Sequence, residues 1–94
     1  MPATSLLSDI RIADMTTVIF GPYCTQTLGD MGAEVIKLEP ETGDTFRGVG
    51  KPANTRGMGP CHMTINRGKR SVVWDMKSDE GQEAIRKLIE TSDV

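Results

Sequence analysis

The chain has 94 residues, of which 37% are hydrophobic and 26% charged, and its formal net charge is -2. This length allows one domain at most, and the composition is typical of a globular protein with a small core. It lacks a run of about 20 apolar residues and a basic-then-apolar secretion signal, so we expect a cytoplasmic protein with no membrane partner. The slightly acidic balance argues against general nucleic-acid binding, and we expect no nucleic-acid partner.

The first half of the chain predicts a β-α-β unit. Residues 10–15 alternate apolar and polar side chains, as a strand with one buried face does. A helix is expected next, with Pro22 in its first turn, Gly32 at its carboxyl end, and one apolar face formed by Cys24, Leu28 and Met31. Residues 34–39 form a β-rich run that ends at Pro40. The intervening helix is long enough for a crossover between parallel strands.

The second half predicts a long loop, a third strand and a second helix. Residues 40–60 contain five glycines and three prolines with no apolar period, and a loop of this length is usually functional or disordered. Residues 71–76 predict a strand, and Ser78 or Asp79 can cap a helix that runs to about Thr91. The expected buried stripe of this helix consists of Ala84, Ile85, Leu88 and Ile89. Residues 92–94 resemble the approach to a fourth strand.

This element order predicts an α/β fold with a Rossmann-like parallel sheet, in the sequence β-α-β-loop-β-α. A domain rarely ends where a helix has just returned the chain to a sheet. We therefore expect residues 1–94 to be part of a larger domain.

Ligands of open α/β sheets bind at the carboxyl ends of the strands, which here are segments 16–22, 39–47 and 76–77. The first segment holds a glycine before the helix, Gly21, but no G-x-G-x-x-G pattern; it could bind a ligand, or be a tight turn with Ile19 and Phe20 in the core. Trp74 offers a stacking face for a purine or serves as a core anchor. Lys77 could bind phosphate or point into solvent.

Other candidate residues are less specific. Residues 66–71 contain three cations, which suit either a phosphate-rich ligand or a solvated turn. Asp44 and Arg47 could form a local ion pair or hold a substrate carboxylate. The two cysteines, Cys24 and Cys61, are expected to be reduced thiols, and with the single histidine, His62, they make a poor zinc set. We therefore expect no metal site and no catalytic role for His62.

Together, several blocks resemble the amino-terminal region of the family III CoA-transferases, which include formyl-CoA transferases and acyl-CoA racemases. The blocks are residues 12–26, 28–40, 43–48, 66–71 and 75–81. They occur in the family order with family-like spacing and cover nearly the whole chain.

The resemblance implies that residues 1–94 are the amino-terminal part of a CoA-binding large domain, in a protein that forms an interlocked homodimer. Members move CoA from an acyl-CoA to a carboxylic acid through anhydride and thioester intermediates on an aspartate. That aspartate is expected downstream of this segment, so no catalytic residue is assigned here and the chain alone is expected to be inactive. Coenzyme A or acyl-CoA is the implied substrate, with no metal.

The family's CoA contacts correspond here to two groups of residues. They are Val18, Ile19 and Phe20 at the first turn, and Trp74, Asp75, Met76 and Lys77 at the end of the third strand. Formyl-CoA transferases have glutamine in place of Ile19 and a basic residue in place of Pro40, which argues against an oxalate-specific enzyme. Racemases have a shorter loop than residues 40–65, so a transferase is favoured over a racemase or epimerase. A non-catalytic CoA-binding fragment is the other alternative, and it is compatible with a transferase as the parent protein.

Overall fold

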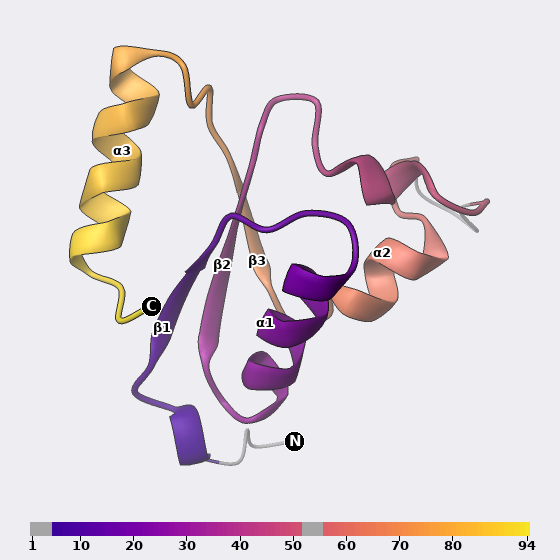
Figure 1. Cartoon of the computed structure of the whole chain (residues 1–94), viewed down its shortest axis with the longest axis horizontal. Helices are drawn as coiled ribbons and strands as arrows, with labels where there is room; N and C mark the ends of the chain where they lie inside the picture. Colours follow the sequence, from indigo (N-terminus) through magenta and orange to yellow (C-terminus); the bar gives the residue numbers. More distant parts are fainter. Residues whose placement is uncertain (1–4, 52–55) are drawn as a thin grey trace.

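The computed structural model describes residues 5–51 and 56–94, and it contains a parallel three-stranded sheet with strand order β1-β2-β3 (Figure 1). The predicted α/β fold is confirmed. The strands are β1 (Arg11–Asp14), β2 (Glu34–Glu39) and β3 (Arg70–Val73). The helices are α1 (Phe20–Asp30), α2 (Pro60–Ile65) and α3 (Asp79–Glu90), with short 3-10 turns η1 (Ser5–Leu7) and η2 (Thr45–Gly48).

The third strand and the long loop differ from their predictions. β3 ends at Val73 rather than at residue 76, because the chain turns after Trp74, whose N–H still donates to the Glu39 carbonyl at 3.2 Å. The predicted loop contains η2, and α2 begins at Pro60, where the missing proline N–H costs a helix nothing. A helix of six residues is too short to show an apolar period, so it was not predicted.

The carboxyl end of the chain lies against β1, on the edge that does not pair with β2 (Figure 1). The Asp93 N–H donates to the Arg11 carbonyl at 2.8 Å, and the Ala13 N–H donates to the Val94 carbonyl at 2.9 Å. α3 therefore carries the chain from β3 past β2 to the far side of β1. This reversal of strand order is typical of a doubly wound sheet.

The two helix faces were predicted only in part. In α1 the buried residues are Pro22, Thr25 and Gln26. Of the predicted face, Leu28 is half-buried and packs on the apolar core, whereas Cys24 and Met31 are exposed. The reason is that α1 packs on the polar end of the sheet, where the Thr25 hydroxyl donates to Asp14 Oδ2 at 2.7 Å. Gly32, with φ +108°, follows the helix as expected.

In α3 the predicted cap is confirmed, because the Ser78 hydroxyl accepts the Gly81 N–H at 2.9 Å. Leu88 is buried and Ala84 and Ile85 are half-buried, but Ile89 is exposed and does not belong to the stripe. Among residues 5–51 and 56–94, no helix is both long and apolar enough to cross a membrane.

The parallel register places Ile12 beside Val35 and Asp14 beside Lys37. Paired residues share a face of the sheet, so the face that holds these residues is apolar at its amino end and charged at its carboxyl end. Ile12, Val35 and Ala33 form the apolar cluster. The charged end leads directly into the candidate site.

Candidate functional site

A pocket of about 320 Å³ opens where β2 and β3 end. Its walls are Pro40, Glu41 and Thr42 from the segment after β2, and Trp74, Asp75, Met76 and Lys77 from the segment after β3. The structure thus brings together the four site residues predicted at the end of the third strand, and it adds the residues that follow β2. The two segments lie together because parallel strands end at one edge of the sheet.

Trp74 is half-buried and lines a second hollow of about 310 Å³ as well. That hollow also involves Val73 and the amino-terminal end of α3, including Gly81. The indole therefore keeps accessible surface and is not enclosed in the core. This is the arrangement that base stacking requires.

Lys77 is exposed, and its backbone N–H donates to Asp75 Oδ1 at 3.0 Å. Within the part of the chain that the structure describes, its ammonium has no ion-pair partner. It is a free cation beside Trp74, and Glu41 adds a carboxylate to the same pocket.

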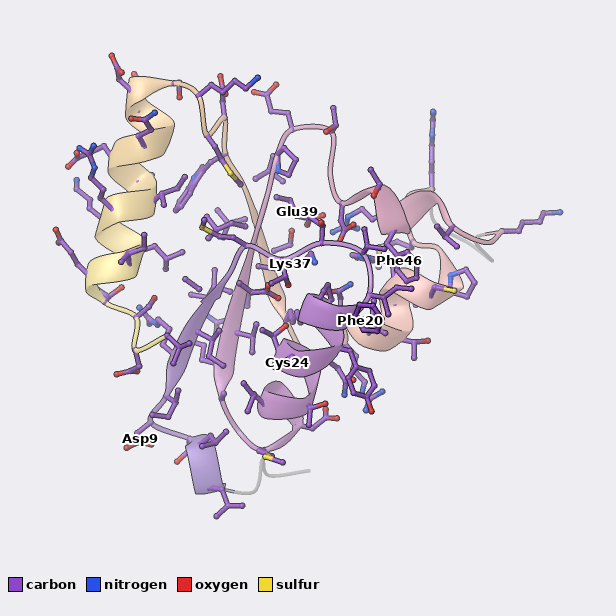
Figure 2. The ribbon with its side chains drawn as sticks, in the orientation of Figure 1. Asp9, Phe20, Cys24, Lys37, Glu39 and Phe46 are labelled. Carbon is purple, nitrogen blue, oxygen red and sulfur yellow. The ribbon has the colours of Figure 1, made fainter. Side chains whose placement is uncertain are left out.

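The first turn exposes three apolar side chains. Val18, Ile19 and Phe20 are 42%, 44% and 90% exposed, so the alternative in which Ile19 and Phe20 fill the core is wrong. Figure 2 shows Phe20 at the first turn of α1, apart from Lys37 and Glu39, which lie toward the carboxyl end of β2. A Cβ on Gly21 would lie 2.3 Å from the Thr16 Cβ, so this turn requires glycine there.

The two predicted groups do not line one common pocket. The first turn follows β1 and the Trp74 pocket follows β3, with the end of β2 between them. They occupy the same edge of the sheet, as a long ligand with a nucleotide at one end and a reactive group at the other would need.

Sequence reasoning missed a buried ionic network between these groups. Lys37 and Lys69 each use three acceptors and share Asn66 Oδ1, at 3.1 and 2.8 Å. Lys37 Nζ also lies 2.9 Å from Asp44 Oδ2 and 3.2 Å from the Thr16 carbonyl. Lys69 Nζ also lies 2.9 Å from Asp14 Oδ2 and 3.0 Å from the Pro22 carbonyl.

Glu39 completes the network with a bidentate ion pair. Arg47 Nε and Nη2 each lie 2.7 Å from one Glu39 oxygen, and the Ser71 hydroxyl and the Asp44 N–H also donate to this carboxylate. The Arg47 hydrogen bonds, helped by that of Ser71, lower the pKa of Glu39 to about 2 although burial opposes the change.

The other network groups are also shifted. Burial alone would raise the pKa of Asp14, but hydrogen bonds from Thr16, Lys69 and Thr25 outweigh it and lower that pKa. Burial also opposes the fall of the Asp44 pKa, which the Phe46 N–H and Lys37 produce. Burial lowers the pKa of Lys69, although Asp14 opposes this. Each of these carboxylates is ionised at neutral pH and matched by a cation, so none is a free nucleophile.

The structure settles how the cations of residues 66–71 are used. Arg67 and Arg70 form exposed pairs with Asp30 and Glu34, as a solvated turn predicts, whereas Lys69 is buried in the network with Asp14. Asp44 and Arg47 do not pair with each other, because Arg47 binds Glu39 and Asp44 binds Lys37. The signal for the network was the pair Lys37 and Glu39, two residues apart on one face of a central strand.

His62 is buried, with Nδ1 3.1 Å from the Asn66 amide nitrogen. Burial lowers its pKa, with Arg47 adding to the effect, so the ring is neutral at pH 7. Cys24 and Cys61 are exposed free thiols. No cluster of three or more metal-binding side chains occurs among the residues that the structure describes.

Known proteins match this sequence and fold. The sequence profile of CoA-transferase family III matches residues 7–94. The succinyl-CoA:mesaconate CoA-transferase of Haloarcula hispanica is 42% identical over 91 residues, which cover 94% of this chain and 23% of that protein. The succinate–glutarate CoA-transferase of Agrobacterium fabrum is 44% identical over 94 residues, covering 94% and 24%.

A solved structure agrees. The crystal structure of a CAIB/BAIF family protein from Brucella suis matches with a TM-score of 0.87 and 35% identity, over 94% of this chain and 24% of that one. The chain spans about a quarter of the length of the curated relatives named here. Because the family profile covers nearly every residue of the described strands and helices, the chain belongs to CoA-transferase family III.

Proposed function

We propose that this chain is the amino-terminal part of the CoA-binding domain of a longer CoA-transferase, called the full-length protein below. That enzyme moves CoA from an acyl-CoA to a carboxylic acid. The relatives named above are transferases, which favours this reaction over racemisation. Their names specify succinyl-CoA or succinate with a second dicarboxylic acid, so we propose succinyl-CoA as donor and a dicarboxylic acid as acceptor.

The observation that carries the proposal is the pocket after β2 and β3, where an accessible indole lies beside a lysine that has no ion-pair partner among the described residues. Trp74 and Met76 would contact the adenine, and the Lys77 ammonium would bind the CoA phosphates. Asp75 fixes the turn by accepting the Lys77 N–H. Val18, Ile19 and Phe20 would lie at the thioester end of the ligand.

The nucleophile is proposed to be an aspartate outside residues 1–94. Its carboxylate would attack the thioester carbonyl, releasing CoA as a thiolate and forming a mixed anhydride. The buried carboxylates described here are unsuited to this role, because Asp14, Glu39 and Asp44 are each held by a cation. We also propose an interlocked homodimer in the cytoplasm.

The test is transfer of CoA from succinyl-CoA to a panel of dicarboxylic acids by the full-length protein, with new acyl-CoA esters separated by chromatography. We expect a new ester with at least one acceptor, and none when the 94-residue chain is used alone. Absence of both CoA binding and transfer in the full-length protein would refute the proposal. Turnover by the isolated chain that is lost on Asp14→Asn would refute the placement of the nucleophile.

A further inference from the structure

The turn before α1 has a conformation that its own sequence disfavours. Val18 has φ +70°, a left-handed value that β-branched residues rarely adopt. Such a backbone persists only where surrounding contacts hold it. The residue is 42% exposed, so packing holds it only in part.

Polar contacts hold this turn at both ends. Lys37 Nζ donates to the Thr16 carbonyl at 3.2 Å, and Asp44 Oδ1 accepts the Val18 N–H at 3.4 Å. Lys37 and Asp44 themselves form a buried pair, with 2.9 Å between Nζ and Oδ2. Asp14 also fixes Thr16, because Asp14 Oδ1 accepts the Thr16 N–H at 2.9 Å.

Asp44 is itself fixed in place. Its N–H donates to Glu39 Oε1 at 2.9 Å, and its Oδ1 also accepts the Phe46 N–H at 2.9 Å. Asp44 is only 2% exposed, so water does not compete for the hydrogen bonds of its carboxylate. The segment after β2 and the turn after β1 are thereby joined through one side chain.

We propose that Asp44 is a positioning residue, which holds the Val18 turn in the geometry that presents the turn to the acyl end of the bound thioester. This inference rests on the proposed function. Asp44 itself touches no substrate in this account; it acts through the Val18 backbone. A small displacement of a reacting group lowers the rate of the chemical step more than it lowers the affinity for the remote nucleotide.

The experiment uses three variants of the full-length protein with succinyl-CoA. Asp44→Ala removes the acceptor, so we expect kcat to fall about tenfold or more while the Kd for CoA changes by less than about twofold. Asp44→Asn keeps an oxygen for the two amides but places its NH2 group against the Lys37 ammonium, so we expect a kcat between those of the wild-type protein and Asp44→Ala. Leu38→Ala is the control, because Leu38 is buried on the opposite face of β2 and its loss weakens packing without touching the turn.

A second measurement does not depend on any variant folding. Hydrogen exchange of the Val18 amide, resolved by ¹⁵N-valine labelling, should be about tenfold or more slower than in an unstructured peptide, because Asp44 binds it. Exchange at the unstructured rate would overturn the proposal. So would equal kcat losses in Asp44→Ala and Leu38→Ala, or an unchanged kcat in Asp44→Ala. A wild-type protein without transferase activity would refute the proposed function instead. The exchange rate of the Val18 amide would still show whether Asp44 holds the turn.

Discussion

Glu39 and Glu34 lie on the same strand and both pair with arginine, but they differ in burial. The Glu39 side chain is 1% exposed and binds Arg47 at 2.7 Å, whereas the Glu34 side chain is 36% exposed and binds Arg11 at 3.1 Å. Glu39→Gln removes a buried charge and leaves Arg47 without its bidentate partner. Glu34→Gln removes a charge that water already screens.

The magnitude follows from the pKa. A fall of the Glu39 pKa from 4.5 to about 2 corresponds to about 3 kcal/mol of stabilisation at neutral pH, at about 1.4 kcal/mol for each pH unit. Breaking a buried pair commonly costs about 3 to 5 kcal/mol, and the 26% exposure of the Arg47 side chain favours the lower end. For Glu34→Gln we expect a loss below about 1 kcal/mol.

The sign of the pH dependence follows from the same value. Because folding lowers the pKa of Glu39, its contribution is complete above the unfolded pKa of 4.5 and is lost as the pH falls through about 2. Urea denaturation of the wild-type protein and of both variants measures their free energies of unfolding. The stability gap between the wild-type protein and Glu39→Gln should be wide at pH 7 and should close between about pH 5 and pH 2.

Two results would refute this reasoning. One is an equal loss of stability in Glu39→Gln and Glu34→Gln at pH 7. The other is a gap that stays constant down to about pH 2, since a constant gap would mean that the Glu39 charge is not what the Arg47 pair stabilises.

Three further predictions concern CoA binding, the stability of the isolated chain and its activity. In the full-length protein, Trp74→Ala and Lys77→Ala should each raise the Kd for CoA about ten- to hundredfold with little change in kcat, because stacking and charge-assisted contacts are worth about 1 to 3 kcal/mol; normal affinity in both variants would move the nucleotide site elsewhere. The isolated chain should have a free energy of unfolding below about 5 kcal/mol or should self-associate, because the edge of β3 has no neighbouring strand among the described residues. A monodisperse monomer with a higher free energy of unfolding would contradict this. Assayed with succinyl-CoA, the isolated chain should give no transfer, and a new acyl-CoA ester would contradict it.

The elements with strong periodicity could be predicted from the sequence. β2 has the predicted bounds, and α3 begins after Ser78 as its capping hydroxyl indicated. Element order alone predicts a ligand site at the carboxyl ends of the strands, which includes Met76 and Lys77. Trp74 is a candidate because of its residue type and the family resemblance. These features depend on local sequence or on general topology.

The rest depends on contacts between residues far apart in the chain. Lys69 reads as part of a solvated basic turn, and only the fold brings it to Asp14. The apolar pattern of α1 predicts a buried face of Cys24, Leu28 and Met31, of which Leu28 packs on the core. Thr25 and Gln26 are buried instead of Cys24 and Met31 because the sheet below them is charged. The Val18 conformation likewise has no local signal, because Asp44 stabilises it from 26 residues away.

The most direct test of the account is the crystal structure of the full-length protein with CoA bound. We expect the adenine against Trp74, a CoA phosphate within ion-pair distance of Lys77, and the thiol arm directed toward the turn at Val18 and Ile19. CoA bound away from the carboxyl ends of β2 and β3, with Trp74 and Lys77 untouched, would contradict the proposed site.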